Sequence, residues 1–165
     1  MYEYIKGKLI RLESNRAIVE NNGLAYRLMV PLNAAGEIGQ EVQFYLRLVI
    51  KEDAHLLYGF SSKESRDLFE TLITISGIGP KTALALLSHL DGAHLQTAIA
   101  NNDIRIISKV PGIGKKTAER LIIEMRDKFK PGLSVFADTA LSQENNAVMD
   151  AVSALINLGY NPLQA

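Results

Sequence analysis

The chain has 165 residues, no formal net charge and no cysteine, and 47% of its residues are hydrophobic. This length and composition are typical of a folded protein with one domain or a few small ones, and they argue against a wholly disordered chain. The lack of cysteine excludes a disulfide framework, a cysteine-ligated zinc site and a cysteine nucleophile. Because the sequence has no signal-type N-terminus and no apolar run of about 18 residues, we expect a cytoplasmic protein without a membrane segment.

Residues 1–62 have the pattern of a small β-barrel. Short runs of branched and aromatic residues are separated by turns. Asn21-Asn22-Gly23 is the clearest turn, because Asn and Gly tolerate the left-handed backbone of tight hairpins. Five short strands at close spacing favour a closed barrel of the OB-fold type, with a generic β-sandwich as the alternative. The expected strands are Lys8–Leu12, Arg16–Glu20, Leu24–Val30, Val42–Ile50 and Leu56–Phe60.

At Ser61 the hydrophobic period changes from that of strands to that of helices. Ser61 and Glu64 fit a capping box, and the apolar residues that follow lie on one helical face. Helical patterns continue to about Phe129, interrupted by short turns that contain Gly, Asn or Pro. We therefore expect an all-α domain over residues 63–130. Its expected core includes Leu84, Leu86, Leu87, Leu121 and Ile122. The apolar residues of the first helix that share one face are Leu68, Phe69, Leu72 and Ile73, and those in register on the last are Ala118, Leu121, Ile122, Met125 and Phe129.

The last 35 residues predict a linker and the start of a further domain. Residues 131–143 contain Pro, Gly and small polar residues without periodicity, which is typical of a linker. Ala147–Leu158 has the pattern of one amphipathic helix, which cannot bury its apolar face by itself. The helix therefore docks elsewhere, or residues 144–165 are the beginning of a truncated helical domain.

Charge is unevenly distributed along the chain, although its sum is zero. Residues 1–62 carry 7 basic and 7 acidic residues, residues 63–130 carry 11 and 8, and residues 131–165 carry none and 3. Between Lys109 and Lys116 there are three lysines and no acid. A neutral chain argues against a nucleic-acid partner, but this distribution favours one for the middle segment.

An internal repeat with a 35-residue offset carries the most specific pattern. Ile75–Ala83 aligns with Val110–Ala118, and Gly, Ile, Gly, Lys, Thr and Ala recur at the same places. Each copy predicts a helix, a Gly-Ile-Gly turn and a second helix, whose unpaired N-terminal amides and positive dipole end suit an anion. A lysine one or two residues later adds a full charge. Because amides and lysines contact phosphates and not bases, we expect binding to be independent of sequence.

Other phosphate-binding glycine motifs fail on spacing. A P-loop needs a glycine where this chain has Lys109, and a Ser or Thr where it has Lys116. A dinucleotide fingerprint needs a third glycine where Thr82 and Thr117 stand. The remaining alternative is that both motifs are plain helix turns with glycine caps. Phosphate sites are favoured over this alternative, because the motif occurs twice with a lysine at the same place in each copy.

These residues resemble the helix-hairpin-helix motif of DNA-binding proteins, and three motifs in order resemble the RuvA family. The motifs are Lys51-Glu52-Asp53-Ala54-His55-Leu56-Leu57-Tyr58-Gly59-Phe60, Gly77-Ile78-Gly79-Pro80-Lys81 and Pro111-Gly112-Ile113-Gly114-Lys115-Lys116-Thr117-Ala118-Glu119-Arg120-Leu121-Ile122. The resemblance covers nearly the whole chain. It implies an OB-fold barrel, a tandem helix-hairpin-helix domain, and a UBA-like C-terminal domain of three helices.

The resemblance also implies a function and partners. Members bind four-way (Holliday) DNA junctions as homotetramers, one or two per junction. They hold the junction open and square-planar, and load the hexameric RuvB ATPase motor for branch migration in recombination and DNA repair. The RuvC resolvase is a candidate further partner. The chain itself is then non-catalytic, with no cofactor and no metal. Because only the first of the three C-terminal helices is present, we expect junction binding without motor recruitment.

The resemblance assigns roles to individual residues. Arg120 either reaches a phosphate or pairs with Glu124 at i+4. Glu52 and Asp53 match an acidic pin that would repel phosphates at the centre of the tetramer, whereas the residues alone favour a solvated hairpin tip. The expected phosphate-binding residues are Gly77, Gly79, Lys81, Gly112, Gly114, Lys115, Lys116 and Arg120.

Two other functions stay open at this point. One is a DNA-repair enzyme with helix-hairpin-helix units, such as a glycosylase or nuclease, which would need a nucleophile or a set of metal ligands in a cleft. The other is a structural adaptor whose glycine turns bind protein. A gel shift distinguishes the three functions. A preference for the junction without cleavage supports junction binding, cleavage supports a repair enzyme, and no shift supports an adaptor.

Overall fold

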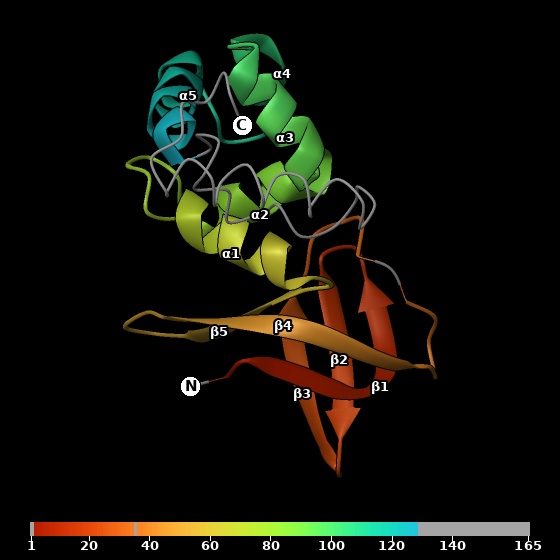
Figure 1. Ribbon diagram of the computed structural model, residues 1–165. Coiled ribbons are helices and arrows are strands. Elements are labelled where there is room, and N and C mark those ends of the chain that lie inside the picture. Colours follow the sequence, from red (N-terminus) through yellow and green to blue (C-terminus); the bar gives the residue numbers. More distant parts are fainter. Residues whose placement is uncertain (1, 35, 129–165) are drawn as a thin grey trace, which may run out of the picture. The chain divides into compact units, whose positions relative to one another are not determined.

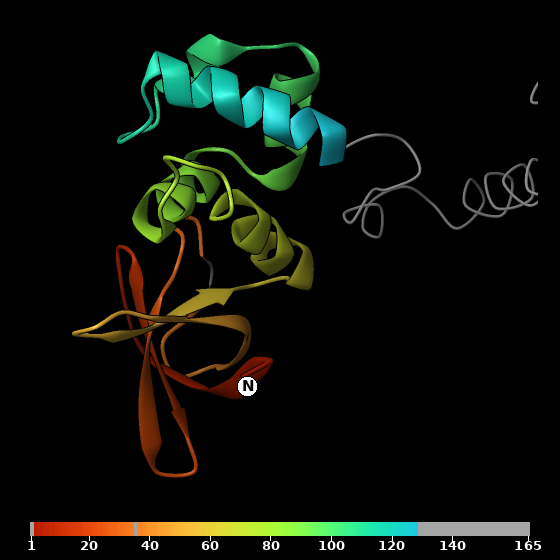
Figure 2. The same ribbon diagram turned by 90° about the vertical axis from the view of Figure 1, so that its left-hand side faces the viewer.

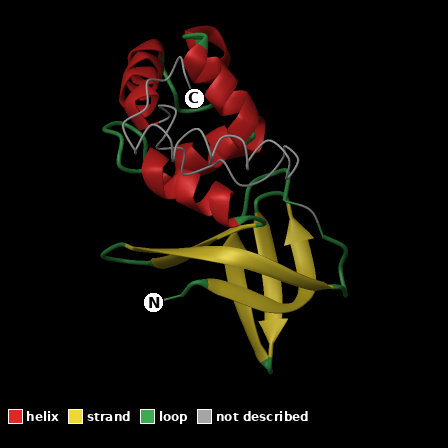
Figure 3. Cartoon of the chain, viewed as in Figure 1, coloured by secondary structure: helices red, strands yellow, loops and turns green. Residues whose placement is uncertain are grey.

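The computed structural model describes residues 2–34 and 36–128, which form a β-barrel followed by helices (Figure 1). These residues all belong to one compact unit, Met1–Val135. Strands and helices are segregated along the chain and in space (Figure 3). The expected linker at 131–143 and the expected helix Ala147–Leu158 lie outside the described residues.

Five strands close into the barrel that the sequence predicts. Their order around the barrel is β1-β2-β3-β5-β4, and β1 pairs with β4 to complete the circle. The β3–β5 pairing is parallel and the others are antiparallel. The strands are β1 (Tyr4–Glu13), β2 (Arg16–Asn21), β3 (Leu24–Met29), β4 (Glu41–Ile50) and β5 (His55–Phe60).

Alternating side chains fill the barrel. Leu9, Ala17, Val19 and Leu28 are fully buried, and they come from the three strands that pair in succession. The turn between β2 and β3 has Asn22 and Gly23 at positive φ, 50° and 85°, as expected for a two-residue hairpin with the right twist.

A bulge interrupts β1 and reverses its alternation. Leu9 pairs with Val19, but the next pair is Arg11 with Ile18, so Ile10 is an extra residue. Without the bulge, Arg11 would follow Leu9 into the core, because residues two apart share a face. With it, Arg11 lies on the outer surface of the barrel.

The helices form two hairpins joined by a connecting helix. The first pairs α1 (Lys63–Leu72) with α2 (Pro80–His89), and the second pairs α4 (Ile104–Ser108) with α5 (Lys115–Lys128). The helix α3 (Gly92–Ala100) connects them. In Figure 2, α1 and α2 lie between the barrel and α5.

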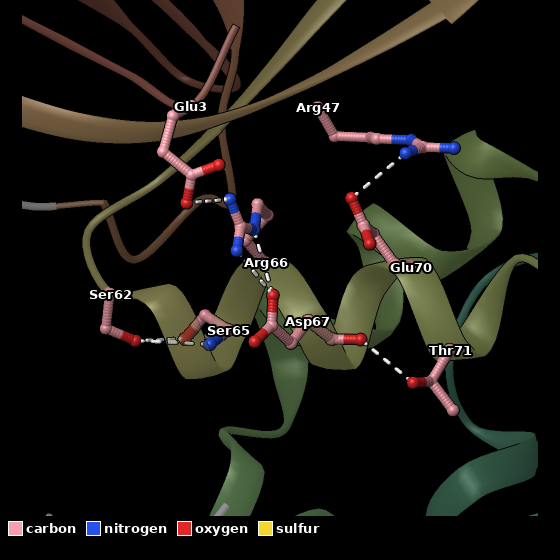
Figure 4. Close-up of polar contacts among 8 residues, drawn as sticks. All are labelled: Glu3, Arg47, Ser62, Ser65, Arg66, Asp67, Glu70 and Thr71. Carbon is pink, nitrogen blue, oxygen red and sulfur yellow. Dashed lines mark hydrogen bonds and ion pairs between the residues drawn. The ribbon is translucent and has the colours of Figure 1, made fainter. Parts of the chain in front are cut away.

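The start of α1 differs from the prediction. Ser62, and not Ser61, is the N-cap, and its hydroxyl accepts from the Ser65 amide at 3.2 Å (Figure 4). β5 ends at Phe60 as predicted, and the Phe60 ring is fully buried against α1. Two residues, Ser61 and Ser62, separate β5 from α1, and because the second of them caps the helix, the Ser61–Glu64 capping box does not form.

Helix α1 joins the barrel to the helices. The Phe69 ring lies 4.9 Å from both Tyr58 and Phe60, so it extends the apolar interior of the barrel into the helices. Two ion pairs flank this contact: Arg47 with Glu70 at 3.1 Å, and Arg66 with Glu3 at 2.7 Å (Figure 4).

Arg66 is the buried charged residue at this junction, 8% exposed. Burial is the largest single influence on the pKa of its guanidinium and lowers it. The hydrogen bonds and ion pairs with Glu3 and Asp67 together raise the pKa by more than burial lowers it, so the net shift is upward. The arginine therefore stays charged and ties the first residues of the barrel to α1.

Candidate nucleic-acid interface

The two Gly-Ile-Gly turns have the same backbone geometry, 35 residues apart. Gly77 and Gly112 have φ of 90° and 88°, a left-handed region that is costly for any residue with a Cβ. Each turn is closed by a hydrogen bond of 3.0 Å, from the Ile78 amide to the Ile75 carbonyl and from the Ile113 amide to the Val110 carbonyl. The first glycine of each copy is thus required by the backbone.

The isoleucine between the glycines fills the inside of each hairpin, as predicted. Ile78 and Ile113 are buried, and so are Ala83 and Ala118 one turn into the helices that follow. The expected core residues of α2 and α5 are buried too: Leu84, Leu86, Leu87, Leu121 and Ile122. So is Met125, which is in register with them. The repeat in the sequence is therefore a repeat in packing.

The second glycine of each copy has no such structural requirement. Gly79 has an ordinary extended backbone, φ −86° and ψ 172°, and Gly114 has no positive φ. A Cβ built on either would meet no atom within 4 Å. The missing side chain leaves the space in front of each helix N-terminus open to an external group.

The helix N-termini behind these glycines are suited to an anion. First-turn amides have no partner inside a helix, and Gly79 offers no side-chain cap. Pro80 stands at the first position of α2, where no N–H is needed. Neither α2 nor α5 has an acid in its first turn. The amides and helix dipoles of both hairpins can therefore face a phosphate.

The expected lysines stand on the same ends of these helices. Lys81, Lys115 and Lys116 are exposed. Lys115 lies 4.0 Å from the Glu119 carboxylate with 80% of its side chain exposed, so this surface pair holds it only weakly. All three ammonium groups are free to reach a phosphate beside the amides.

The two turns face each other through a reciprocal contact that sequence reasoning missed. A Cβ on Gly77 would lie 3.7 Å from the Thr117 side chain, and a Cβ on Gly112 would lie 3.3 Å from the Thr82 hydroxyl. Each threonine thus packs on the glycine turn of the other hairpin. The recurrence of Thr in both copies was the available signal. The packing of each threonine on the opposite turn fixes the spacing of the two anion sites.

Arg120 joins the hairpins as well. Its Nη1 donates to the Ser76 carbonyl oxygen at 3.4 Å, so an α5 side chain reaches the turn before α2. Within the described residues it forms no ion pair with Glu124, the alternative drawn from the sequence. The guanidinium is exposed, and its other donors point to no protein acceptor in the described part of the chain.

Glu52 and Asp53 lie in the tip between β4 and β5. The Lys51 amide donates to the Ala54 carbonyl at 2.8 Å and closes the turn, and both carboxylates are exposed. In the part of the chain that the structure describes, neither forms an ion pair. The tip and the loop before α2 both extend to the left in Figure 1.

Two further findings concern the described residues alone. No three His, Asp or Glu side chains there come close enough together to hold a metal ion. No helix among them has the length and apolar character needed to cross a membrane.

Comparisons with known proteins match the same two parts of the chain. The model of the RuvA N terminal domain matches residues 1–59, and that of the SAM-like helix-hairpin-helix tandem matches residues 69–127. A Holliday junction branch migration complex subunit RuvA from Protochlamydia amoebophila is 45% identical, over 100% of this chain and 86% of its own. Subunits of the same name from Streptococcus agalactiae and Pseudomonas entomophila are 43% and 41% identical, over 97% and 98% of this chain and 84% of theirs.

Proposed function

The chain belongs to the RuvA family, and on this premise we propose that it binds four-way (Holliday) DNA junctions as the junction-binding subunit of a branch migration complex. The observation that carries the proposal is the pair of equivalent helix N-termini, each opened by a glycine without a structural need for one. Two such sites at a fixed spacing suit two phosphates of one duplex arm.

The phosphates are held by amides and charges together. In the first hairpin the residues are Gly77, Gly79 and Lys81. In the second they are Gly112, Gly114, Lys115 and Lys116. The remaining donors of Arg120 reach toward the same backbone. Because none of these groups contacts a base edge, binding is independent of DNA sequence.

The acidic tip gives selectivity for shape. Carboxylates repel phosphates, so Glu52 and Asp53 act against a continuous duplex and are accommodated at the open centre of a junction. Four tips around one axis would hold the arms apart in a square-planar form. This role rests on their exposure and on the lack of a neutralising partner within the described residues.

The assembly is a homotetramer, one or two of which enclose a junction. A four-armed ligand and a single kind of subunit are most simply matched by four-fold cyclic symmetry. The barrel, residues 1–62, supplies the central tips, and residues 63–130 supply the arms of the binding surface. The subunit is non-catalytic and cytoplasmic. RuvB supplies ATP hydrolysis, and RuvC is a candidate partner for resolution.

A gel shift of a four-way junction against a duplex of equal length tests the function. We expect a junction preference without cleavage. Cleavage would instead support a repair enzyme, and no shift would support an adaptor. Light scattering on the same sample tests the tetramer, and a stable monomer at micromolar concentration would contradict it.

The double change Glu52→Gln with Asp53→Asn tests the tip, since it keeps the volume and removes both charges. We expect duplex affinity to rise more than junction affinity, most visibly at low salt where screening is weakest. The control is Glu37→Gln with Glu41→Gln, which removes the same charge from two exposed carboxylates of residues 1–62 outside the tip, of which Glu41 pairs with Lys6 at 3.1 Å. An unchanged ratio of the two affinities would reduce the pair to a solvated tip.

A further inference from the structure

Three arginines gather on the outer face of the barrel, away from the hairpin turns in sequence. Arg11 on β1 and Arg27 on β3 both pair with Ile18 on β2, so the three side chains form one row across adjacent strands. Arg16 stands two residues before Ile18 and therefore shares its face. Together with Glu13, these residues line a hollow of about 190 Å³.

The bulge at Ile10 is what completes this cluster. It turns Arg11 from the inner to the outer face, beside the other two arginines. Ala17 and Val19 point inward on either side of Ile18 and are fully buried, which fixes the outward direction of Arg16 and Ile18.

The cluster has an excess of positive charge. Arg11 lies 3.5 Å from the Glu13 carboxylate, and both side chains are more than half exposed, 62% and 58%. Arg16 and Arg27 are exposed and form no ion pair within the described residues. Three guanidinium groups thus face one carboxylate, although residues 1–62 as a whole carry equal numbers of basic and acidic residues.

The chemistry of the cluster suits phosphates better than a protein surface. A guanidinium presents planar paired donors that match two phosphate oxygens. Arginine is enriched in protein–protein interfaces together with aromatic residues and Met around an apolar core, whereas surfaces that bind nucleic acid are polar and strongly positive. Here Ile18, half-buried, is the apolar residue among four charged ones.

We propose that Arg11, Arg16 and Arg27 form a second phosphodiester-binding surface, which contacts a DNA segment different from the one held by the hairpins. This inference rests on the proposed function. The end of β3, where Met29 pairs with Arg16, leads to the opposite end of α2 from the Gly79 turn. The Leu32 amide, three residues beyond β3, donates to the Ser88 hydroxyl near the last turn of α2 at 3.0 Å. A ten-residue helix is about 15 Å long, too far for one phosphate to reach both ends.

The test is the salt dependence of junction binding by a triple Arg→Gln variant, R11Q/R16Q/R27Q. The slope of log affinity against log salt should become shallower by about 0.9 for each phosphate that the variant no longer neutralises. The triple Arg→Lys variant, R11K/R16K/R27K, should keep the slope and lose part of the affinity, because it keeps charge without paired donors. The control is Arg47→Gln, an exposed arginine on β4, which should leave the slope unchanged.

Two measurements on the same samples separate the outcomes. Thermal unfolding should be unchanged, since all three side chains are exposed, and light scattering should give an unchanged mass. An unchanged slope for R11Q/R16Q/R27Q overturns the proposal. A changed mass with an unchanged slope also overturns it, and assigns the cluster to contact with a second copy of the chain.

Failure of this inference is distinguishable from failure of the proposed function. If the unchanged chain binds the junction and a Lys115→Ala/Lys116→Ala variant has a shallower slope, the hairpin function holds whatever the arginines do. If the unchanged chain does not bind the junction, the proposed function itself fails.

Discussion

The two hairpins build the same turn from unequal supports. The first has a ten-residue helix before the turn, joined to the barrel through Phe69 and two ion pairs. The second has a five-residue helix, α4, in that place. The first has Pro80 and one lysine where the second has Lys115 and Lys116. The repeated residues fix the geometry of the turn, and the residues that differ set its anchoring and its charge.

We expect the largest effect on stability from removing Phe69, which joins the first hairpin to the barrel. Phe69→Ala removes a fully buried ring between Tyr58 and Phe60 and should lower the free energy of unfolding by about 3–5 kcal/mol. Ile104, 35 residues later, is half-buried, and Ile104→Ala should cost less. Denaturant unfolding of both variants checks this, and equal losses would contradict the unequal support.

The next effect tests the first glycine of each turn. Gly77→Ala and Gly112→Ala place a Cβ at positive φ, at an expected cost of about 1–2 kcal/mol in stability. Gly112→Ala should cost more, because its Cβ would lie 3.3 Å from the Thr82 hydroxyl. Adding Thr82→Ala should recover part of that loss, and adding Thr117→Ala should not. A recovery that is the same with either partner would disprove the reciprocal packing.

The two hairpins also differ in charge, with one lysine at the first turn and two at the second. Lys115→Ala with Lys116→Ala should make the salt slope of junction binding shallower by about 1.8, and Lys81→Ala by about 0.9, with sequence preference unchanged. Lys8→Ala with Lys63→Ala, exposed lysines outside the hairpin turns, is the control. If it changes the slope as much as the hairpin variants do, the hairpins are not the phosphate sites.

The second glycine separates function from fold. Gly79→Ser and Gly114→Ser should leave the stability unchanged or slightly raised, because Ser is a good N-cap and the site is open. Junction affinity should fall by about tenfold, or about 1.4 kcal/mol, since the new side chain occupies the space of the phosphate. Affinity equal to that of the unchanged chain would show that no ligand approaches this position.

The smallest effect concerns α3, which connects the hairpins. The Asp91 carboxylate caps α3 by accepting a hydrogen bond from the His94 amide. This bond is the largest influence on the carboxyl pKa and lowers it from its ordinary value. Burial raises the pKa, and the His94 ring lowers it, so the net shift is downward. A lowered pKa in the folded state stabilises the fold at neutral pH, and this contribution is lost as the pH falls through that pKa. Asp91→Ala should cost about 1 kcal/mol at pH 7 and progressively less in acid.

Asp91→Asn is the matched control, because Asn caps a helix as well as Asp does but does not titrate. It should cost little at pH 7, and unfolding measured from pH 7 downward should lose the dependence attributed to Asp91. A loss at pH 7 as large as that of the alanine variant would assign the role to charge instead of to the cap.

The barrel and the turns could be predicted because their causes are local in the sequence. Runs of branched and aromatic residues between turns predicted the five strands, although β1 begins at Tyr4 and not at the expected Lys8. The 35-residue repeat predicted the turns, the isoleucines that fill them and the positions of the lysines. Helix capping at Ser62 was missed by one residue, because adjacent Ser61 and Ser62 are equally good N-cap residues and only the backbone shows that the Ser62 hydroxyl accepts from the Ser65 amide.

Features that depend on pairing between distant residues could not be predicted. The bulge at Ile10 depends on the register between β1 and β2, and one residue decides which face Arg11 takes. The bond from Arg120 to Ser76 and the contacts of Thr82 and Thr117 need the arrangement of two hairpins in space. No helical or strand period encodes such contacts.

The reciprocal contacts of the two turns limit how the molecule can be divided. A fragment that stops before α4 would keep the Gly77 turn without Thr117, the residue that covers it. Its own Thr82 would then be able to pack on the same kind of turn in a second fragment, because Gly, Ile, Gly, Lys, Thr and Ala recur at the same places in both turns. We therefore expect a single hairpin to be less stable alone than in the intact chain. Two copies of it carry the groups needed to pair with each other in the way that the two halves of the intact chain do.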